Sequence, residues 1–190
     1  MSFDVEIEGV EKLKEILKKL PERIFPGVKS EYRKAIGGLH REMQERISGG
    51  VLKRRTGELS RSFISGVSGS KLSDVFGMVA TRSKYAPIHE YGGAITPKTA
   101  KHLTIPLPDN KTKAGVTRKS ARQLISEGKS FFRKSKRGNL ILFTNNRGDL
   151  KPMFVLVDRV SIPARLGFSQ TAQKWFESLL TSLIGLIERI

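Results

Sequence analysis

Residues 22–47 read ERIFPGVKSEYRKAIGGLHREMQERI and carry the clearest structural pattern in the chain. Gly37 and Gly38 lower the helix propensity in the middle of this stretch. On either side of them, apolar residues recur at steps of three and four, which places them on one face of a helix whose other side is charged. We therefore expect one long amphipathic helix, with the two glycines as the place where it could kink. Its apolar face consists of Val28, Tyr32, Ala35, Ile36, Leu39, Met43 and Ile47.

The flanking regions predict two more helices and a set of short strands. Residues 170–190 predict a C-terminal helix whose apolar face is wider than the stripe of about 100° that packing on one core requires. Phe3, Val5 and Ile7 alternate with acidic or polar residues, as in a half-buried strand, and residues 10–20 predict a short helix. Further strands are expected at residues 59–67, 74–81, 103–107, 139–144 and 153–162.

These elements predict an α+β fold, in which a mainly antiparallel sheet packs against a long N-terminal helix and a C-terminal helix. Strands that follow one another without intervening helices favour antiparallel pairing. The 190 residues fit a single domain, 1–190. Because the chain has no cysteine, disulfides and thiolate metal sites are excluded. We expect neither a signal peptide nor a membrane partner, since the start lacks the leader pattern and the apolar runs fall short of the roughly 20 residues of a span.

The charge of the chain is strongly unbalanced. It has 35 Lys and Arg against 18 Asp and Glu, a net charge of +17, and such an excess favours polyanionic partners. Residues 96–137 hold 12 basic and 2 acidic residues and predict a basic loop or arm inserted between sheet strands, which orders on a negative surface. The alternative is a solvated loop without a partner. The candidate binding residues are Lys111, Lys113, Arg118, Lys119, Arg122, Arg133, Lys134, Lys136 and Arg137.

The sequence contains no candidate catalytic residue, cofactor site or metal site. His89 and Glu90 are adjacent, but the zinc-protease pattern requires two histidines on one helical face. Pro87 before them and Gly92 and Gly93 after them argue against a helix there. Nucleophile elbows, phosphate-binding loops and clustered carboxylates for metal ions are also missing from the sequence. We therefore predict that the protein is not an enzyme.

Three segments together resemble one family, the tailed-bacteriophage neck and tail-completion proteins, also called phage virion morphogenesis proteins. Residues 52–63, LKRRTGELSRSF, resemble the family stretch R-T-G-x-L-x-x-S-[IF]. Residues 85–93, YAPIHEYGG, resemble Y-A-x-x-x-E-[FY]-G, and residues 162–165, IPAR, resemble the P-A-R-P-F element before the final helix. The chain departs from the family after Arg165, where Leu166 to Phe168 replace Pro-Phe.

The resemblance implies a structural role at the junction of phage head and tail. It implies a ring of identical subunits, six-fold to match the tail or twelve-fold to match the portal, which completes the tail or joins it to the head connector and lets DNA pass. The implied partners are head-closure or connector proteins, tail-terminator or tail-tube proteins, and genomic DNA bound without sequence preference. The implied location is the virion, with the host cytoplasm as the place of assembly.

The motif residues have structural and interfacial interpretations that the sequence leaves open. Glycines usually allow the backbone conformation of a turn. Glu90, in contrast, could pair with an arginine of its own or a neighbouring subunit. The family-motif residues are Thr56, Gly57, Tyr85, Glu90, Tyr91, Gly92 and Arg165. The alternative function is a sequence-nonspecific nucleic-acid-binding protein, and a hydrolase acting on a polyanion has still less support.

Overall fold

The computed structural model describes residues 5–189, and its contacts divide the chain into two compact units. Unit 1 comprises Met1–Tyr91 and Ala164–Ile190, and unit 2 comprises Gly92–Pro163. The sequence led us to expect one domain, whereas the chain leaves unit 1 after Tyr91, forms unit 2 and returns at Ala164. The predicted α+β class is confirmed, with antiparallel sheets and long helices near both ends of the chain.

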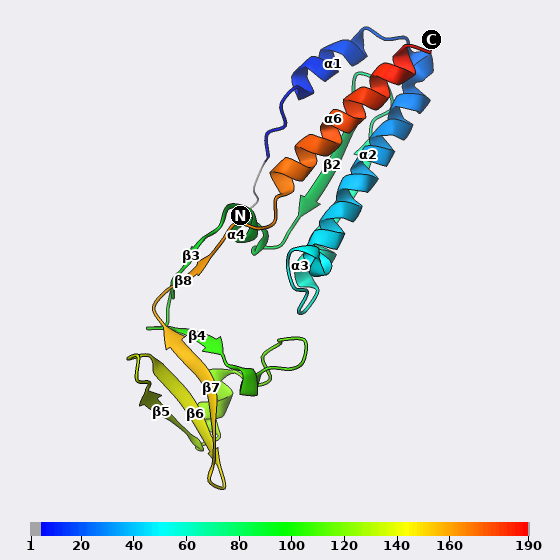
Figure 1. Ribbon diagram of the computed structural model, residues 1–190. Coiled ribbons are helices and arrows are strands. Elements are labelled where there is room, and N and C mark those ends of the chain that lie inside the picture. The colour runs from blue at the N-terminus through cyan, green and yellow to red at the C-terminus, as the bar shows by residue number, and fades with distance from the viewer. Residues whose placement is uncertain (1–4, 190) are drawn as a thin grey trace. The chain divides into compact units, whose positions relative to one another are not determined.

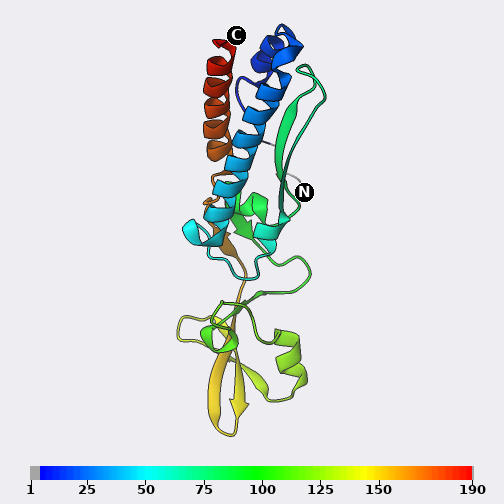
Figure 2. The same cartoon turned by 90° about the vertical axis from the view of Figure 1, so that its right-hand side faces the viewer.

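Unit 1 is built around two long helices. The short 3-10 helix η1 (Glu22–Ile24) leads into α2 (Phe25–Glu45), which continues into a π-helical turn, η2 (Arg46–Gly50). Helix α6 (Phe168–Ile187) packs along α2, and Figures 1 and 2 show the two side by side and running in opposite directions. The predicted long helix is therefore confirmed.

Helix α2 passes through Gly37 and Gly38 without interruption. A Cβ atom at Gly38 would lie 2.2 Å from Cη2 of Trp175 on α6, whereas one at Gly37 would meet nothing within 4 Å. The indole of Trp175 also donates from Nε1 to Glu42 at 2.8 Å. Gly38 therefore permits the close approach of α6, and the kink that the sequence left open is not formed.

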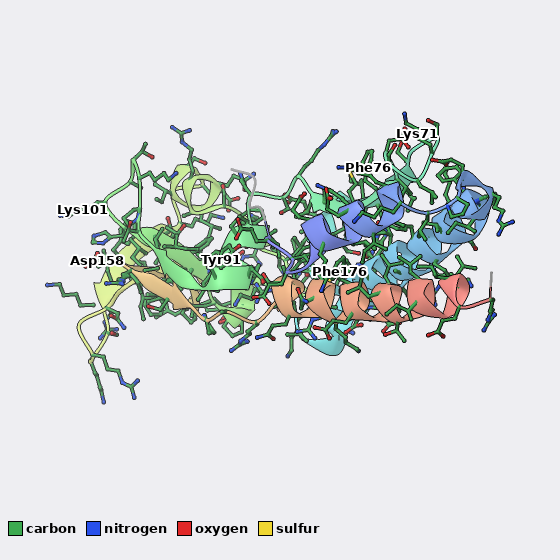
Figure 3. The ribbon with its side chains drawn as sticks, turned by 90° about the horizontal axis from the view of Figure 1, so that it is seen from above. Lys71, Phe76, Tyr91, Lys101, Asp158 and Phe176 are labelled. Carbon is green, nitrogen blue, oxygen red and sulfur yellow. The ribbon has the colours of Figure 1, made fainter. Side chains whose placement is uncertain are left out.

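Smaller elements of unit 1 cover the helix pair. Helix α1 (Val10–Lys18) buries Leu13 and Leu17, and in Figure 3 it lies between the labelled Phe76 and Phe176. Strands β1 (Phe63–Ser68) and β2 (Phe76–Thr81) form an antiparallel hairpin that packs on α2. A Cβ atom at Gly77 would lie 2.5 Å from Ile36, so the glycine lets the hairpin approach the helix.

Two predictions of unit 1 need correction. Residues 59–67 were expected to form a strand, but they begin as the short helix α3 (Glu58–Ser62) before β1. The predicted strand at Phe3, Val5 and Ile7 lies partly outside the described residues. Its described part, residues 5–7, belongs to no strand, although Val5 and Ile7 pack against the core.

Unit 2 contains a two-stranded and a four-stranded antiparallel sheet. Strands β3 (Gly93–Ile95) and β8 (Val160–Ile162) pair where the chain enters and leaves the unit. The larger sheet has the order β4-β7-β6-β5, and a bulge after Leu142 brings Phe143 opposite Pro152. A bulge tolerates a proline, which has no N–H to donate to the ladder. The strands are β4 (Leu103–Pro106), β5 (Ser130–Lys134), β6 (Leu140–Asn146) and β7 (Asp149–Val157).

Residues 96–137 are not a loop or arm, contrary to the prediction from the sequence. They supply both edge strands of the larger sheet, β4 and β5, with the 3-10 helix η3 (Pro108–Asn110) and helix α5 (Ala121–Ser126) between them. Ser120 and Gln123 form a capping box at the start of α5, with bonds of 3.2 and 2.8 Å. The strand expected at residues 103–107 corresponds to β4, whereas α5 and β5 were not expected, because they depend on capping and on strand pairing.

Candidate functional site

The three motif segments line one hollow in unit 1. Its volume is about 770 Å³. The first segment supplies most of the wall, and Tyr85, His89 and Arg165 come from the second and third segments. The segments are far apart in the sequence, so the fold alone brings them together.

The first segment is held by the end of the long helix. The backbone N–H groups of Val51 and Leu52 both donate to the Arg46 carbonyl at 2.9 Å. Gly57 then adopts a left-handed conformation, with a φ of 74°, directly before α3. A Cβ atom there would lie 2.9 Å from Nη1 of Arg61 and 3.0 Å from Nε of Arg54. The left-handed φ therefore favours glycine in the Arg-Thr-Gly motif, whereas the atoms that a Cβ would meet are the flexible ends of two arginine side chains.

Thr56 stabilises the turn of this motif through a side-chain hydrogen bond. Its Oγ1 accepts a hydrogen bond from the N–H of Glu58 at 3.3 Å, in the first turn of α3. Neighbouring Ser60 is buried and donates its hydroxyl to the side chain of Gln44 on α2. Gln44 also donates to the Ser60 carbonyl at 2.8 Å. These bonds fix α3 to the long helix and so fix one wall of the hollow.

The second segment forms helix α4 (Ala86–Tyr91), although the sequence argued against a helix there. Pro87 is the second residue of the helix, where its missing N–H has no intrahelical partner in any case. The glycines end the helix without preventing it, since Gly92 has a φ of 71° and Gly93 one of 144°. The helix carries His89 toward the hollow, and Tyr85, which directly precedes it, is 44% exposed.

Glu90 caps the start of α6 and is not paired with an arginine. Its Oε2 accepts from the N–H of Phe168 at 2.7 Å, and its Oε1 accepts from the N–H of Ser169 at 3.0 Å. The Ser169 hydroxyl also donates to Oε1, at 2.7 Å. A carboxylate at a helix N-terminus satisfies N–H groups that lack intrahelical partners. Within its own chain, Glu90 therefore joins α4 to the C-terminal helix, whereas its pairing with a neighbouring subunit stays a prediction.

The third segment is bonded to the second through the backbone. The N–H groups of Arg165 and Leu166 both donate to the carbonyl of His89 at 2.8 Å, and Nε of Arg46 donates to the carbonyl of Leu166 at 2.7 Å. Leu166 is fully buried, and Phe168 packs on Phe63 with 6.2 Å between ring centroids. Two of the three residues that replace the Pro-Phe of the family thus supply core contacts.

The hollow combines a basic lining with an apolar floor. Lys53, Arg54, Arg55 and Arg165 line it together with a single acid, Glu58. Within residues 5–189, neither Lys53, Arg54 nor Arg165 forms an ion pair. Burial, and then the nearby Arg165 guanidinium, lower the pKa of His89 from its ordinary 6.5. The imidazole is therefore neutral at pH 7, and the site is suited to binding carboxylates or phosphates through its arginines. The apolar lining comes from Ile47, Val51, Leu52 and Leu59.

Potential metal ligands do not gather around this hollow in the described part of the chain. No group of three or more His, Asp or Glu between residues 5 and 189 is positioned to hold a metal ion. The other two histidines lie elsewhere, His40 bonded to Ser65 at 2.7 Å and His102 to Asp158 at 2.6 Å. No helix in the described part of the chain is long and apolar enough to cross a membrane.

The candidate basic residues lie in unit 2 and form two groups. One group lies in the loop after η3 and on α5, and the other lies on β5 and in the turn that follows it. The loop is closed at its base by fully buried Asn110, which donates to the Lys119 carbonyl at 2.8 Å and accepts from the Lys119 N–H at 3.1 Å. Lys119 is paired with Glu127 at 2.6 Å. The loop group and α5 hold Lys111, Lys113, Arg118, Lys119 and Arg122, and β5 with its turn holds Arg133, Lys134, Lys136 and Arg137.

Of the four basic residues in the lining, the sequence singled out Arg165 but not Lys53, Arg54 and Arg55. These three stand directly before the Thr-Gly of the motif, and this adjacency was the available signal. Tyr91, a predicted interface residue, is 59% exposed at the end of α4 and is labelled in Figure 3.

No family model, curated protein or solved structure matches this chain.

Proposed function

We propose that this protein is a structural component of the head–tail junction of a tailed bacteriophage. It forms a ring that completes the tail or joins it to the head connector, and the DNA passes through the ring. The observation that carries this proposal is the meeting of the three motif segments around one hollow. Independent turns that resembled a family by chance would have no reason to converge on one surface.

A contact role fits this hollow better than catalysis does. Glu90, the acid of the second motif, is engaged by the start of α6 and is not directed at a substrate. Ser60, the only serine that lines the hollow, donates its hydroxyl to Gln44 and not to a histidine base. The motif residues therefore support a rigid surface, as an assembly interface requires.

The proposed partners are other copies of the chain and the neighbouring layers of the junction. A six-fold ring would match the tail and a twelve-fold ring would match the portal. Connector proteins would lie on one side, and tail-terminator or tail-tube proteins on the other. Unit 2, with 15 basic and 4 acidic residues, would face genomic DNA or an acidic protein ring. The protein would act in the virion and assemble in the host cytoplasm.

Electron microscopy of the purified full chain, alone and with isolated tail tubes, tests the proposal. We expect rings with a central opening, either in solution or on the end of a tube. A protein that stays monomeric under both conditions would contradict it.

The second candidate function is nonspecific nucleic-acid binding, and the charge of unit 2 favours it. Changing Lys134, Lys136 and Arg137 to Ser should then reduce the salt dependence of DNA affinity, because each lost phosphate contact removes about 0.9 from the slope. The matched control changes Arg33, Arg41 and Lys34 on α2 to Ser. Tight DNA binding by a monomer that never forms rings would favour this function over the first.

A further inference from the structure

Three basic residues that line the hollow of unit 1 have no acidic partner among the described residues. Four basic residues line it with one acid, and Lys53, Arg54 and Arg165 form no ion pair within the described residues. In a protein with a net charge of +17, clustering basic side chains in a hollow lowers the stability of the fold, because these charges repel one another. A ligand that brings carboxylates or phosphates would offset that repulsion.

The apolar floor indicates which kind of ligand fits. Among the lining residues, Ile47 is buried and Leu52 and Leu59 are half-buried, whereas the basic residues 53–55 are exposed. Duplex DNA presents its phosphates on the outside of a rigid rod and would contact a rim without reaching such a floor. Single strands bind through several stacking aromatic residues, and Tyr85 is the only aromatic residue in the lining. A polypeptide segment that carries carboxylates is therefore the better match.

The chain itself carries such a segment. Residues 1–11 contain four acidic residues and no basic ones, in a protein with 35 Lys and Arg. Glu6 and Glu8 are exposed, and neither forms an ion pair among the described residues. Ile7 between them packs against the core, and the N–H of Glu8 donates to Gln173 at 3.2 Å. The two carboxylates therefore project from an anchored segment.

We propose that the hollow of one subunit binds the Glu6 and Glu8 carboxylates of a second copy of this chain. The segment and the hollow consist of different residues, so the contact joins unlike parts of the two copies, and contacts of this head-to-tail kind produce rings when they close. This inference rests on the proposed ring and names the residues that close it. In a strongly basic protein, a contact between opposite charges also overcomes the mutual repulsion of the subunits.

Charge reversal and mixing test the contact in the full-length protein. The first variant combines Arg54→Glu with Arg165→Glu, and the second combines Glu6→Lys with Glu8→Lys. The control combines Arg33→Glu with Arg41→Glu on the exposed side of α2, which gives the same net charge as the first variant. Sedimentation velocity over a range of protein and salt concentrations measures self-association, and circular dichroism checks that each variant is folded.

We expect each of the first two variants alone to associate at least about tenfold more weakly than the wild type, and the control to associate like the wild type. An equal mixture of the two variants should recover association, since alternating copies restore opposite charges at every contact. If the mixture does not recover, or if the first variant associates normally, the inference is wrong while the ring proposal stands. If the wild type associates only on tail tubes, the same variants are compared there by electron microscopy, and normal rings formed by the first variant would overturn the inference. Loss of duplex DNA binding in the first variant, with self-association unchanged, would assign the hollow to nucleic acid instead.

Discussion

The two units of this protein differ in what holds them together. Among the described residues, unit 1 contains nineteen buried hydrophobic side chains, whereas unit 2 contains only Leu124, Leu142 and Phe154. Unit 2 nevertheless has the more extensive sheet and carries 15 basic against 4 acidic residues. Unit 1 is therefore stabilised mainly by apolar burial, and unit 2 mainly by strand pairing and local caps.

This difference indicates that the two units differ in how far their own cores stabilise them. A small unit with three buried apolar side chains has little stability to spare, and its excess positive charge lowers that stability further through self-repulsion. Such a unit gains most when a negative partner covers it. Unit 1 can stand alone and hold the motif hollow rigid, whereas unit 2 is suited to a surface that is completed in an assembly.

The largest expected effect is the loss of unit 2 after a single core truncation. Leu142 is fully buried between Leu124 and Phe154, and Leu142→Ala should cost about 2–5 kcal/mol. We expect amide hydrogen exchange to show lost protection across β4 to β7 with unit 1 unchanged. The matched variant, Leu17→Ala in unit 1, should lower the melting temperature and leave the unit folded. Equal loss of protection in both units after Leu142→Ala would mean that they unfold as one body.

A pair of glycine variants sharpens the comparison within unit 1. A Cβ atom at Gly38 would overlap Trp175, so Gly38→Ala should destabilise unit 1 by about 1–3 kcal/mol. Gly37→Ala meets open space and should stabilise α2 by about 0.5–1 kcal/mol. Urea unfolding followed by Trp175 fluorescence measures both changes. Equal effects of the two substitutions would show that α6 does not depend on the close approach at Gly38.

The cap on α6 should contribute somewhat less. Glu90→Gln keeps the shape of the side chain but removes the charge that accepts from Phe168 and Ser169, and it should cost about 1 kcal/mol. We expect ring formation or solubility to suffer through the loosened α4 contact, without the loss of any enzymatic activity. Glu45→Gln on the exposed end of α2 is the control. A nuclease or hydrolase activity that disappears in Glu90→Gln, with the fold intact, would refute the structural role.

The sequence predicted the helices far better than the site. The three- and four-residue spacing of apolar residues correctly predicted α2 and α6, because packing and helix propensity favour the same structure there. Helix α4 was missed because Pro87 and the following glycines seemed to forbid a helix, although a proline is tolerated in the first turn. Within residues 96–137 the sequence predicted β4 but missed α5 and β5, because α5 depends on a capping box and β5 on its partner strand. Neither a capping box nor pairing with another strand appears as a regular spacing of apolar residues in the sequence.

The candidate site could be predicted only as three separate motifs. Gly57 and Arg165 were recognised as motif residues, but nothing in the sequence shows that they line the same hollow. Glu90 could not be assigned, because its partners, the N–H groups of Phe168 and Ser169, lie 78 and 79 residues further along the chain. Contacts over such separations are a property of the tertiary fold, which local patterns do not record.

The smallest expected effect is a pH dependence that belongs to unit 1 alone. Burial, and then Arg165, hold the pKa of His89 below 6.5 in the folded protein. The unfolded chain therefore takes up more protons at this site below about pH 6.5, so stability is present above that pH and is lost as the pH falls through the folded value. Urea midpoints measured between pH 8 and pH 5 should decline toward the acid side, and less so in His89→Gln. The imidazole resonances of His89 should titrate below the ordinary range of histidine.

Since the lowered pKa of His89 depends in part on Arg165, Arg165→Gln should raise that pKa. If Arg165→Gln leaves the titration of His89 unchanged, the guanidinium does not act on the imidazole, and the hollow is less positive at His89 than the proposed contact with Glu6 and Glu8 requires.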